Sequence, residues 1–293
     1  MRNKRIALVA FLGILLIGLF ALWVFRIFHP PARFNGQRAY KDVLAQVAFG
    51  PRLNGSQAHA KTIIYIQDKL RKTGWLTELQ QTVWQGFPVE NIIAFRPNQS
   101  PQIILGSHYD SRMLADQDPG PGRNQPVPGA NDGASGVAIL LELARTLPHN
   151  SIPVSLVFFD AEDNGDLNGQ DWIMGSRAYV AALKFRPRAA IILDMVGDYD
   201  LNLYIEGNSD AKLAAEIWAQ AASLNHRQQF IPAIRYSMLD DHTPFLEAGI
   251  PAVDIIDFDY PYWHTAADTP DKVSSASLQI VGETVRAWLI AQK

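Results

Sequence analysis

The stretch VFFDAEDNG, residues 157–165, decides how the rest of the sequence is interpreted. It completes an apolar run that begins at Ser155 and leads directly into three acids within four residues. Such a run predicts a buried strand of a parallel sheet, and ligands bind where these strands end. Adjacent side chains of an extended chain point to opposite sides, so Glu162 and Asp163 can face different partners, a metal and a substrate. For this stretch alone, a solvated acidic turn is an equally good interpretation.

The composition excludes several classes of protein. The chain has 293 residues, a formal net charge of −3 and no cysteine. This length and balance suit one large α/β domain, with or without a tail. The near-neutral charge gives no reason to expect a nucleic-acid partner. Because thiolates and disulfides are excluded, any metal must be held by His, Asp and Glu.

Residues 1–29 predict an N-terminal transmembrane segment. Basic residues precede an unbroken apolar run over residues 6–25, and a helix of that length spans roughly 30 Å, the thickness of a bilayer core. The alternative is a cleaved signal peptide, which usually has a shorter apolar region and a small-x-small site after it. We expect a single-pass membrane anchor, a linker over residues 30–38 and one domain over residues 39–293 on the extracytoplasmic side.

Strands and helices are expected to alternate along this domain. An early hairpin over residues 76–84 and 89–95 is the exception. Further strands are expected at residues 102–106, 152–159, 189–193, 201–205 and 251–256, and helices at residues 39–47, 56–72, 137–147, 170–183, 211–223 and 275–291. This alternation predicts a three-layer α/β/α fold with a mixed, mostly parallel central sheet.

Five strand ends or the loops after them carry a His or an Asp: His108, Asp132, Asp163, Asp194 and His264. Since the carboxyl ends of parallel strands lie at one edge of a sheet, these side chains can converge. Two His with three carboxylates are a typical donor set for zinc, and Asp132 can bridge two ions about 3.5–4 Å apart. Taken singly, each residue has a structural interpretation: Asp132, for example, can cap the following helix. Together they indicate a metal site.

One further acid lies close to this set in the sequence. Asp110 follows His108 by two residues. It can be a turn residue, or it can accept the second ring N–H of His108, as carboxylates behind metal-bound histidines do.

Five short motifs also resemble those of a known family. In order and spacing they are similar to the zinc aminopeptidase family that includes the glutaminyl cyclases, and the resemblance covers roughly residues 40–292: HYD (108–110), NDG (131–133), AED (161–163), LDM (193–195) and WHT (263–265). It implies a zinc-dependent catalytic domain that acts on peptides or proteins with a free N-terminus. It also implies that one or two zinc ions are held by the five residues named above and that Glu162 is the general base.

The resemblance has details that the structure can test. In the two-metal enzymes Asp132 would bridge; in the cyclases a single zinc would be held by Asp132, Asp163 and His264, with Asp194 in a hydrogen-bond network. The position of Asp163 is more often Glu, which is one methylene longer. In the family the peptide after the bridging Asp is often cis, so we expect a cis bond between Asp132 and Gly133.

Two reactions remain open. An aminopeptidase uses Glu162 to take a proton from a water that attacks the scissile carbonyl. In a glutaminyl cyclase, the substrate's own α-amine attacks its γ-carboxamide and ammonia leaves. Asp240, in DDHTPF (240–245), resembles a cyclase acid where aminopeptidases tend to have Ser, and a close carboxylate pair raises the pKa of one member. We therefore favour the cyclase, with Asp194 and Asp240 assisting Glu162 and with Asp241 behind them.

Aromatic residues are expected to wall the substrate pocket: Tyr260, Tyr262, Trp263 and Trp172. The alternative is that they are ordinary residues of the core or of a rim. A tryptophan that is common near the acidic loop of the cyclases is not matched at Asn168 or Gly169, and Trp172 lies further on. Some proteins with this fold have lost the residues that bind the metal and act as binding modules. That class is disfavoured here because every ligand position and Glu162 are filled.

Overall fold

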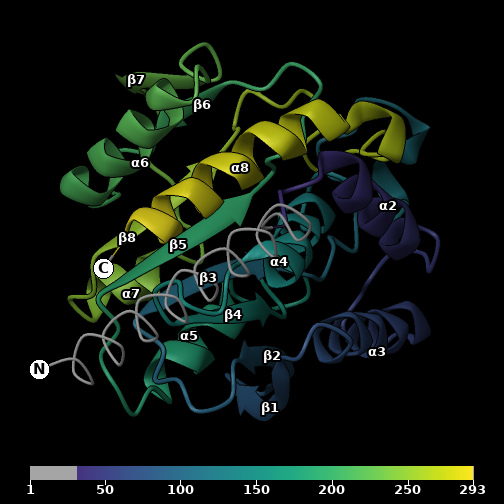
Figure 1. The fold of residues 1–293 in the computed structure, drawn as a ribbon. Helices are drawn as coiled ribbons and strands as arrows, with labels where there is room; N and C mark the ends of the chain where they lie inside the picture. Colours follow the sequence, from purple (N-terminus) through teal and green to yellow (C-terminus); the bar gives the residue numbers. More distant parts are fainter. Residues whose placement is uncertain (1–31, 293) are drawn as a thin grey trace, which may run out of the picture. The chain divides into compact units, whose positions relative to one another are not determined.

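The computed structural model describes residues 32–292 (Figure 1). The predicted membrane anchor lies outside these residues. None of the helices in residues 32–292 combines the length and the apolar composition that a membrane span needs. The elements described below all belong to one unit, which begins at Phe34.

Six strands form the central sheet, in the spatial order β1-β2-β4-β3-β5-β8. Their bounds are β1 Leu76–Trp84, β2 Phe87–Phe95, β3 Ile103–His108, β4 Val154–Phe159, β5 Ala189–Asp194 and β8 Ala252–Ile256. β1 and β2 form an antiparallel hairpin, and β2 also runs antiparallel to β4. The pairs β3–β4, β3–β5 and β5–β8 are parallel. The prediction of a mixed, mostly parallel sheet is therefore confirmed.

Alternate residues of the central strands face two different helical layers. Ile104, Val157 and Ile192 pack on the face that carries α5 (Met174–Ala181) and α7 (Thr243–Glu247). Their neighbours in the strands pack on the opposite face, in one core with residues of α4 (Ala134–Thr146) and α8 (Ser275–Ala291). Figure 1 shows the axis of α8 roughly aligned with that of β5. Both faces are thus covered, which explains why these strands read as continuous apolar runs.

The remaining elements extend this framework. They are the helices α2 (Gly36–Val47), α3 (Gln57–Arg71) and α6 (Ala211–Ser223), the short turns η1 (Pro121–Asn124) and η2 (Pro270–Lys272), and a separate two-stranded parallel sheet of β6 (Leu203–Ile205) and β7 (Phe230–Ile234). β7 was not predicted, because three of its five residues are exposed and its sequence gives no alternation.

Three helix starts differ from the sequence prediction by more than one residue, and one of them is α4, which begins at Ala134 rather than at residue 137. α2 begins at Gly36 rather than at residue 39, because the side chain of Asn35 accepts the N–H of Arg38 and caps the helix. α5 begins at Met174 rather than at residue 170, because Ile173 has a positive φ of 54° that no helix accommodates. The residues between β4 and α5 form a loop, and this loop becomes one wall of the site.

Candidate functional site

Three neighbouring strands bring the predicted site residues to one edge of the sheet. His108 is the last residue of β3 and Asp194 the last of β5, while the acidic turn 160–163 follows β4 directly. Asp132 lies in the loop between β3 and α4, and His264 lies in the loop after β8. After β3, the chain adds β4 on one side of β3 and then β5 on the other side. The strand order therefore changes direction at β3. A crevice at such a point is where open α/β sheets bind ligands.

The two histidines each face a pair of carboxylates. Nε2 of His108 lies 3.1 Å from Oδ1 of Asp132 and 3.1 Å from Oδ1 of Asp194. Nε2 of His264 lies 2.9 Å from Oδ1 of Asp163 and 3.8 Å from Oδ2 of Asp132. We call these sets the His108 triplet (His108, Asp132, Asp194) and the His264 triplet (Asp132, Asp163, His264). In each, the potential ligand atoms lie within 4.8 Å of one another, and Asp132 belongs to both.

The electrostatics of the two triplets fit a bound cation. Oδ2 of Asp132 and Oδ2 of Asp163 are buried without a hydrogen-bond partner. Burial and the charge of Asp132 raise the pKa of Asp163 to about 6, although His264 opposes the rise. Burial likewise raises the pKa of Asp194 to about 7, against the effect of His108. Because buried carboxylates are costly unless they are paired or coordinate a metal, a divalent ion would satisfy these oxygens.

Asp110 holds the ligands from behind. Its Oδ1 lies 3.4 Å from Nδ1 of His108, the ring nitrogen that faces away from the triplet. Its carboxylate also accepts the backbone N–H groups of Glu162 and Asp163, at 3.2 and 3.3 Å. One buried acid therefore orients both a histidine and the acidic turn, as carboxylates behind metal ligands commonly do.

Asp116 lies behind the other histidine, and no pattern in the sequence pointed to it. Its Oδ1 lies 3.6 Å from Nδ1 of His264. Arg112 donates to both oxygens of Asp116, at 2.6 and 2.8 Å, and so fixes the carboxylate in place. Both residues lie in a loop rich in Pro, Gly and Asp, where polar residues are expected without any role.

Glu162 lies in a pocket with four other acids, three of which belong to the triplets. The pocket has a volume of about 220 Å³ and includes Asp194 and Asp240 among its lining residues. Burial raises the pKa of Glu162 well above its usual value; His108 opposes this rise, and the charges of Asp163, Asp240 and Asp241 add to it. Asp241 is fully buried and does not line the pocket. Glu162 is thus surrounded by groups that favour its protonated form.

Two tryptophans form walls of this pocket. Trp263 stacks on the ring of His264 with centroids 3.9 Å apart, and Trp172 lies parallel to the same ring at 5.9 Å. Trp172 reaches this place because Gly165 leaves room for it: a Cβ at Gly165 would lie 2.1 Å from the indole. The loop before α5 therefore supplies an aromatic wall although no tryptophan occupies position 168 or 169.

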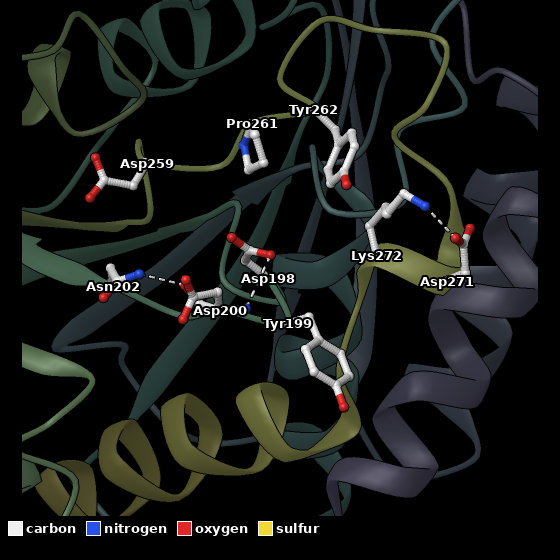
Figure 2. Close-up of a pocket in the computed structure, with 9 residues that line it drawn as sticks. All are labelled: Asp198, Tyr199, Asp200, Asn202, Asp259, Pro261, Tyr262, Asp271 and Lys272. Carbon is white, nitrogen blue, oxygen red and sulfur yellow. Dashed lines mark hydrogen bonds and ion pairs between the residues drawn. The ribbon is translucent and has the colours of Figure 1, made fainter.

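The two tyrosines lie elsewhere. Tyr260 is buried, and its hydroxyl donates to Asp268 at 2.6 Å. Tyr262 lines a neighbouring pocket of about 510 Å³, where Figure 2 shows its ring beside Lys272. Residues 260–264 belong to turns without a regular period, so their sequence spacing could not tell which side chains face the site.

The backbone at the site differs from the expectation in one respect. The described part of the chain contains no cis peptide bond, so the prediction of a cis bond between Asp132 and Gly133 is wrong. Gly133 instead adopts a positive φ of 82°, and a Cβ there would lie 2.9 Å from the ring of His108. Ala161, Met195 and His264 also have positive φ, which concentrates backbone strain beside the ligands, as is common at functional sites.

Comparisons with known proteins agree with this geometry. The model of "Peptidase family M28" matches residues 91–289. A crystal structure of a Zn-dependent exopeptidase from Parabacteroides distasonis is 31% identical, with a TM-score of 0.84 over 89% of this chain and 99% of that one. A glutaminyl cyclase from Tannerella forsythia is 32% identical, with a TM-score of 0.84 over 89% of this chain and 100% of that one. A leucine aminopeptidase precursor from Bacteroides thetaiotaomicron is 30% identical, again with a TM-score of 0.84, over 89% and 99%.

These matches confirm the resemblance that the five motifs indicated. They extend over nearly all of the described residues, and the similar structures carry both of the activities that the sequence left open. The chain belongs to peptidase family M28.

Proposed function

We propose that this protein is a zinc-dependent glutaminyl-peptide cyclotransferase, which converts an N-terminal glutamine of a peptide to pyroglutamate and releases ammonia. The His264 triplet, with Asp132 and Asp163, would hold the zinc of this reaction. The donor set of one imidazole nitrogen and two carboxylates fits zinc and leaves a position open for the substrate. When bound there, zinc would supply polarisation of the γ-carboxamide.

The observation that carries the proposal is the meeting of Glu162 and Asp240 in one small pocket. In cyclisation, the α-amine nitrogen forms a bond to the γ-carbonyl carbon, and the bond from that carbon to the amide nitrogen breaks. One proton must pass from the amine to the departing ammonia. Glu162, whose pKa is raised by burial, is suited to accept and then return this proton. Asp240 adds negative charge beside it and so keeps its proton affinity high.

The pocket walls support an intramolecular reaction. Besides the acids, the lining includes the apolar side chains of Met238, Leu239 and Phe258 and the rings of Trp172 and Trp263. A pocket of about 220 Å³ can hold one small side chain folded back on its own amine. Such walls suit cyclisation, which needs no water nucleophile.

A metallo-aminopeptidase is the alternative. It is favoured by one specific observation: the His108 triplet is as complete as the His264 triplet, and the two share Asp132. Such an arrangement suits two ions with a bridging carboxylate, which activate a water for attack on a peptide carbonyl. Glu162 would then accept the proton of that water.

Incubation with two sets of peptides separates the two reactions. A peptide that starts with Gln should release ammonia and give a product about 17 Da lighter, because cyclisation loses NH₃. Peptides that start with Leu or Ala should stay intact. Asp240→Ser should reduce cyclisation while zinc content stays the same. If Leu-peptides lose their first residue and Gln-peptides do not cyclise, the aminopeptidase is the correct assignment.

A further inference from the structure

The backbone of Asp132 is held from two sides by fully buried charged residues that belong to neither triplet. Its N–H donates to Oδ2 of Asp268 at 3.1 Å, and its carbonyl accepts from Nη2 of Arg52 at 3.2 Å. Both side chains have no exposed surface. Burying a guanidinium and a carboxylate is costly unless each is fully hydrogen-bonded, so these contacts need an explanation.

Arg52 joins the loop of Asp132 to the end of β3. Its Nε donates to the carbonyl of Tyr109, the residue after His108, at 2.8 Å. Its terminal nitrogens donate to the carbonyls of Pro128 and Gly129, at 2.8 and 2.6 Å. A planar guanidinium offers five donors in a fixed fork, so one side chain can fix two backbone segments relative to each other.

Gly129 is adapted to this arrangement. It has a positive φ of 68°, and a Cβ there would lie 2.4 Å from Nη2 of Arg52 and 2.8 Å from the carbonyl of Asp132. Any larger residue would separate the guanidinium from the carbonyls that it joins. The geometry therefore requires both the arginine and this glycine.

Asp268 joins the loop of Asp132 to a different segment. It follows His264 by four residues in the same loop, and its Oδ1 accepts the N–H of Asn131 at 2.9 Å. Tyr260 donates to the same oxygen at 2.6 Å, which ties the carboxylate to the start of that loop. Asp268 therefore sets the loop of His264 against the loop of Asp132.

We infer that Arg52 and Asp268 are positioning residues with separate tasks: Arg52 sets Asp132 relative to His108, and Asp268 sets Asp132 relative to His264. Each buried charge thereby controls one of the two metal positions that share Asp132. Loss of Arg52 should weaken metal binding mainly at the His108 triplet, and loss of Asp268 mainly at the His264 triplet. Groups that orient metal ligands from behind typically change affinity by about 10–100-fold.

The chain offers a matched control for Arg52. Arg96 is also a buried arginine, and its terminal nitrogens donate to the backbone carbonyls of Leu147 and Pro148, just beyond the last turn of α4. Arg52 thus fixes the segment before α4 and Arg96 the segment after it. Replacing either one removes a buried guanidinium from a loop, but only Arg52 lies beside a metal position.

The inference can be tested on the two histidines separately. The full chain with ¹⁵N-labelled histidine would be titrated with zinc, and the ring-nitrogen signals of His108 and His264 followed by NMR, with assignments from single histidine replacements. Arg52→Met should weaken zinc binding at His108 by about 10-fold or more and leave His264 less affected, whereas Asp268→Asn should do the reverse. Arg96→Met should change neither signal, even if it lowers stability. If Arg52→Met does not fold, Arg52→Lys takes its place, because an ammonium cannot reproduce the fork.

The possible results separate this inference from the proposed function, on whose zinc site it rests. If the wild-type chain binds no zinc at either histidine, both fail. If it binds zinc but the two variants weaken both histidines equally, or neither, only the inference fails. If zinc loads only at His264, Asp268→Asn must weaken it more than Arg52→Met does; the opposite order would overturn the inference.

Discussion

Glu206 and the two triplets are buried alike, but their surroundings are opposite. The carboxylate of Glu206 accepts the backbone N–H groups of Asn208, Ser209 and Met238, at 3.0, 2.7 and 2.9 Å, and lies 3.2 Å from Nε2 of His242. Burial acts to raise its pKa, but these hydrogen bonds outweigh burial and lower the value to about 2. In the triplets, by contrast, Asp163 keeps one buried oxygen without any donor, and its pKa rises to about 6.

The difference shows what distinguishes a structural acid from a ligand. A buried carboxylate that is surrounded by N–H donors has all its hydrogen bonds satisfied, and its charge stabilises the fold. A buried carboxylate that faces only histidines and other acids keeps an oxygen without a partner, and a bound cation would supply that partner. Burial alone does not separate the two cases, since both acids are almost without exposed surface; the number of donors does.

The largest effect is expected at Glu162. Glu162→Gln keeps the size of the side chain but cannot accept a proton, so turnover of the preferred peptide should fall by about 10²–10⁴ or more. Zinc content should stay close to that of the wild type, because Glu162 belongs to neither triplet. Glu247→Gln, which changes a surface acid paired with Arg177, serves as the control. Near-normal turnover of Glu162→Gln would show that this acid is structural, like Glu206.

Glu206→Gln should lower the stability of the fold, whereas Glu162→Gln lowers turnover. The pKa of Glu206 is about 2 in the folded state and 4.5 in the unfolded state, so its charge contributes stability above pH 4.5 that is lost as the pH falls towards 2. The variant should be less stable than the wild type by about 3 kcal/mol at pH 7, and the difference should shrink below pH 4.5. Urea unfolding over this pH range measures it. A constant difference down to pH 2 would contradict the role given to the charge.

Asp163→Asn should raise the free energy of unfolding of the metal-free protein, whereas Glu206→Gln lowers it, and the change should be no larger. Its pKa rises from 3.8 to about 6, so the unfolded state releases the proton first and the metal-free protein loses stability as the pH rises through this range. In the metal-free state, Asp163→Asn should be more stable than the wild type by up to about 3 kcal/mol above pH 6, and no more stable below pH 3.8. Added zinc should reverse the order, because the wild type binds it better. A less stable metal-free variant would mean that Asp163 has donors that the structure lacks.

The parts of this molecule that could be predicted from its sequence are those with a regular period. Apolar runs placed the parallel strands within about two residues, and the strand ends then pointed to all five members of the triplets, because one edge of a parallel sheet gathers its carboxyl ends. Trp172 was predicted from the resemblance to the cyclases, which have a tryptophan near the acidic loop, and it lines the pocket in the structure.

The parts that could not be predicted depend on contacts between distant residues. Arg52 meets Asp132 across 80 positions of sequence, and Asp268 meets it across 136, and no local pattern records either contact. Tyr262 was predicted to wall the pocket but lines the neighbouring one, because side-chain directions in a loop follow no period. The positions of the strands can thus be predicted from local sequence patterns. The residues that orient the metal ligands cannot, because they contact those ligands only in the tertiary structure.

The zinc site itself can be tested by metal analysis of the purified full chain. The wild-type protein, loaded with zinc and then freed of excess by gel filtration, should retain one or two ions per chain. His264→Ala should lose the ion of the His264 triplet, because a four-coordinate zinc cannot easily give up a protein ligand, while Glu206→Gln should retain the wild-type amount. A wild-type chain that retains no zinc, or a His264→Ala chain that retains all of it and stays active, would contradict the account.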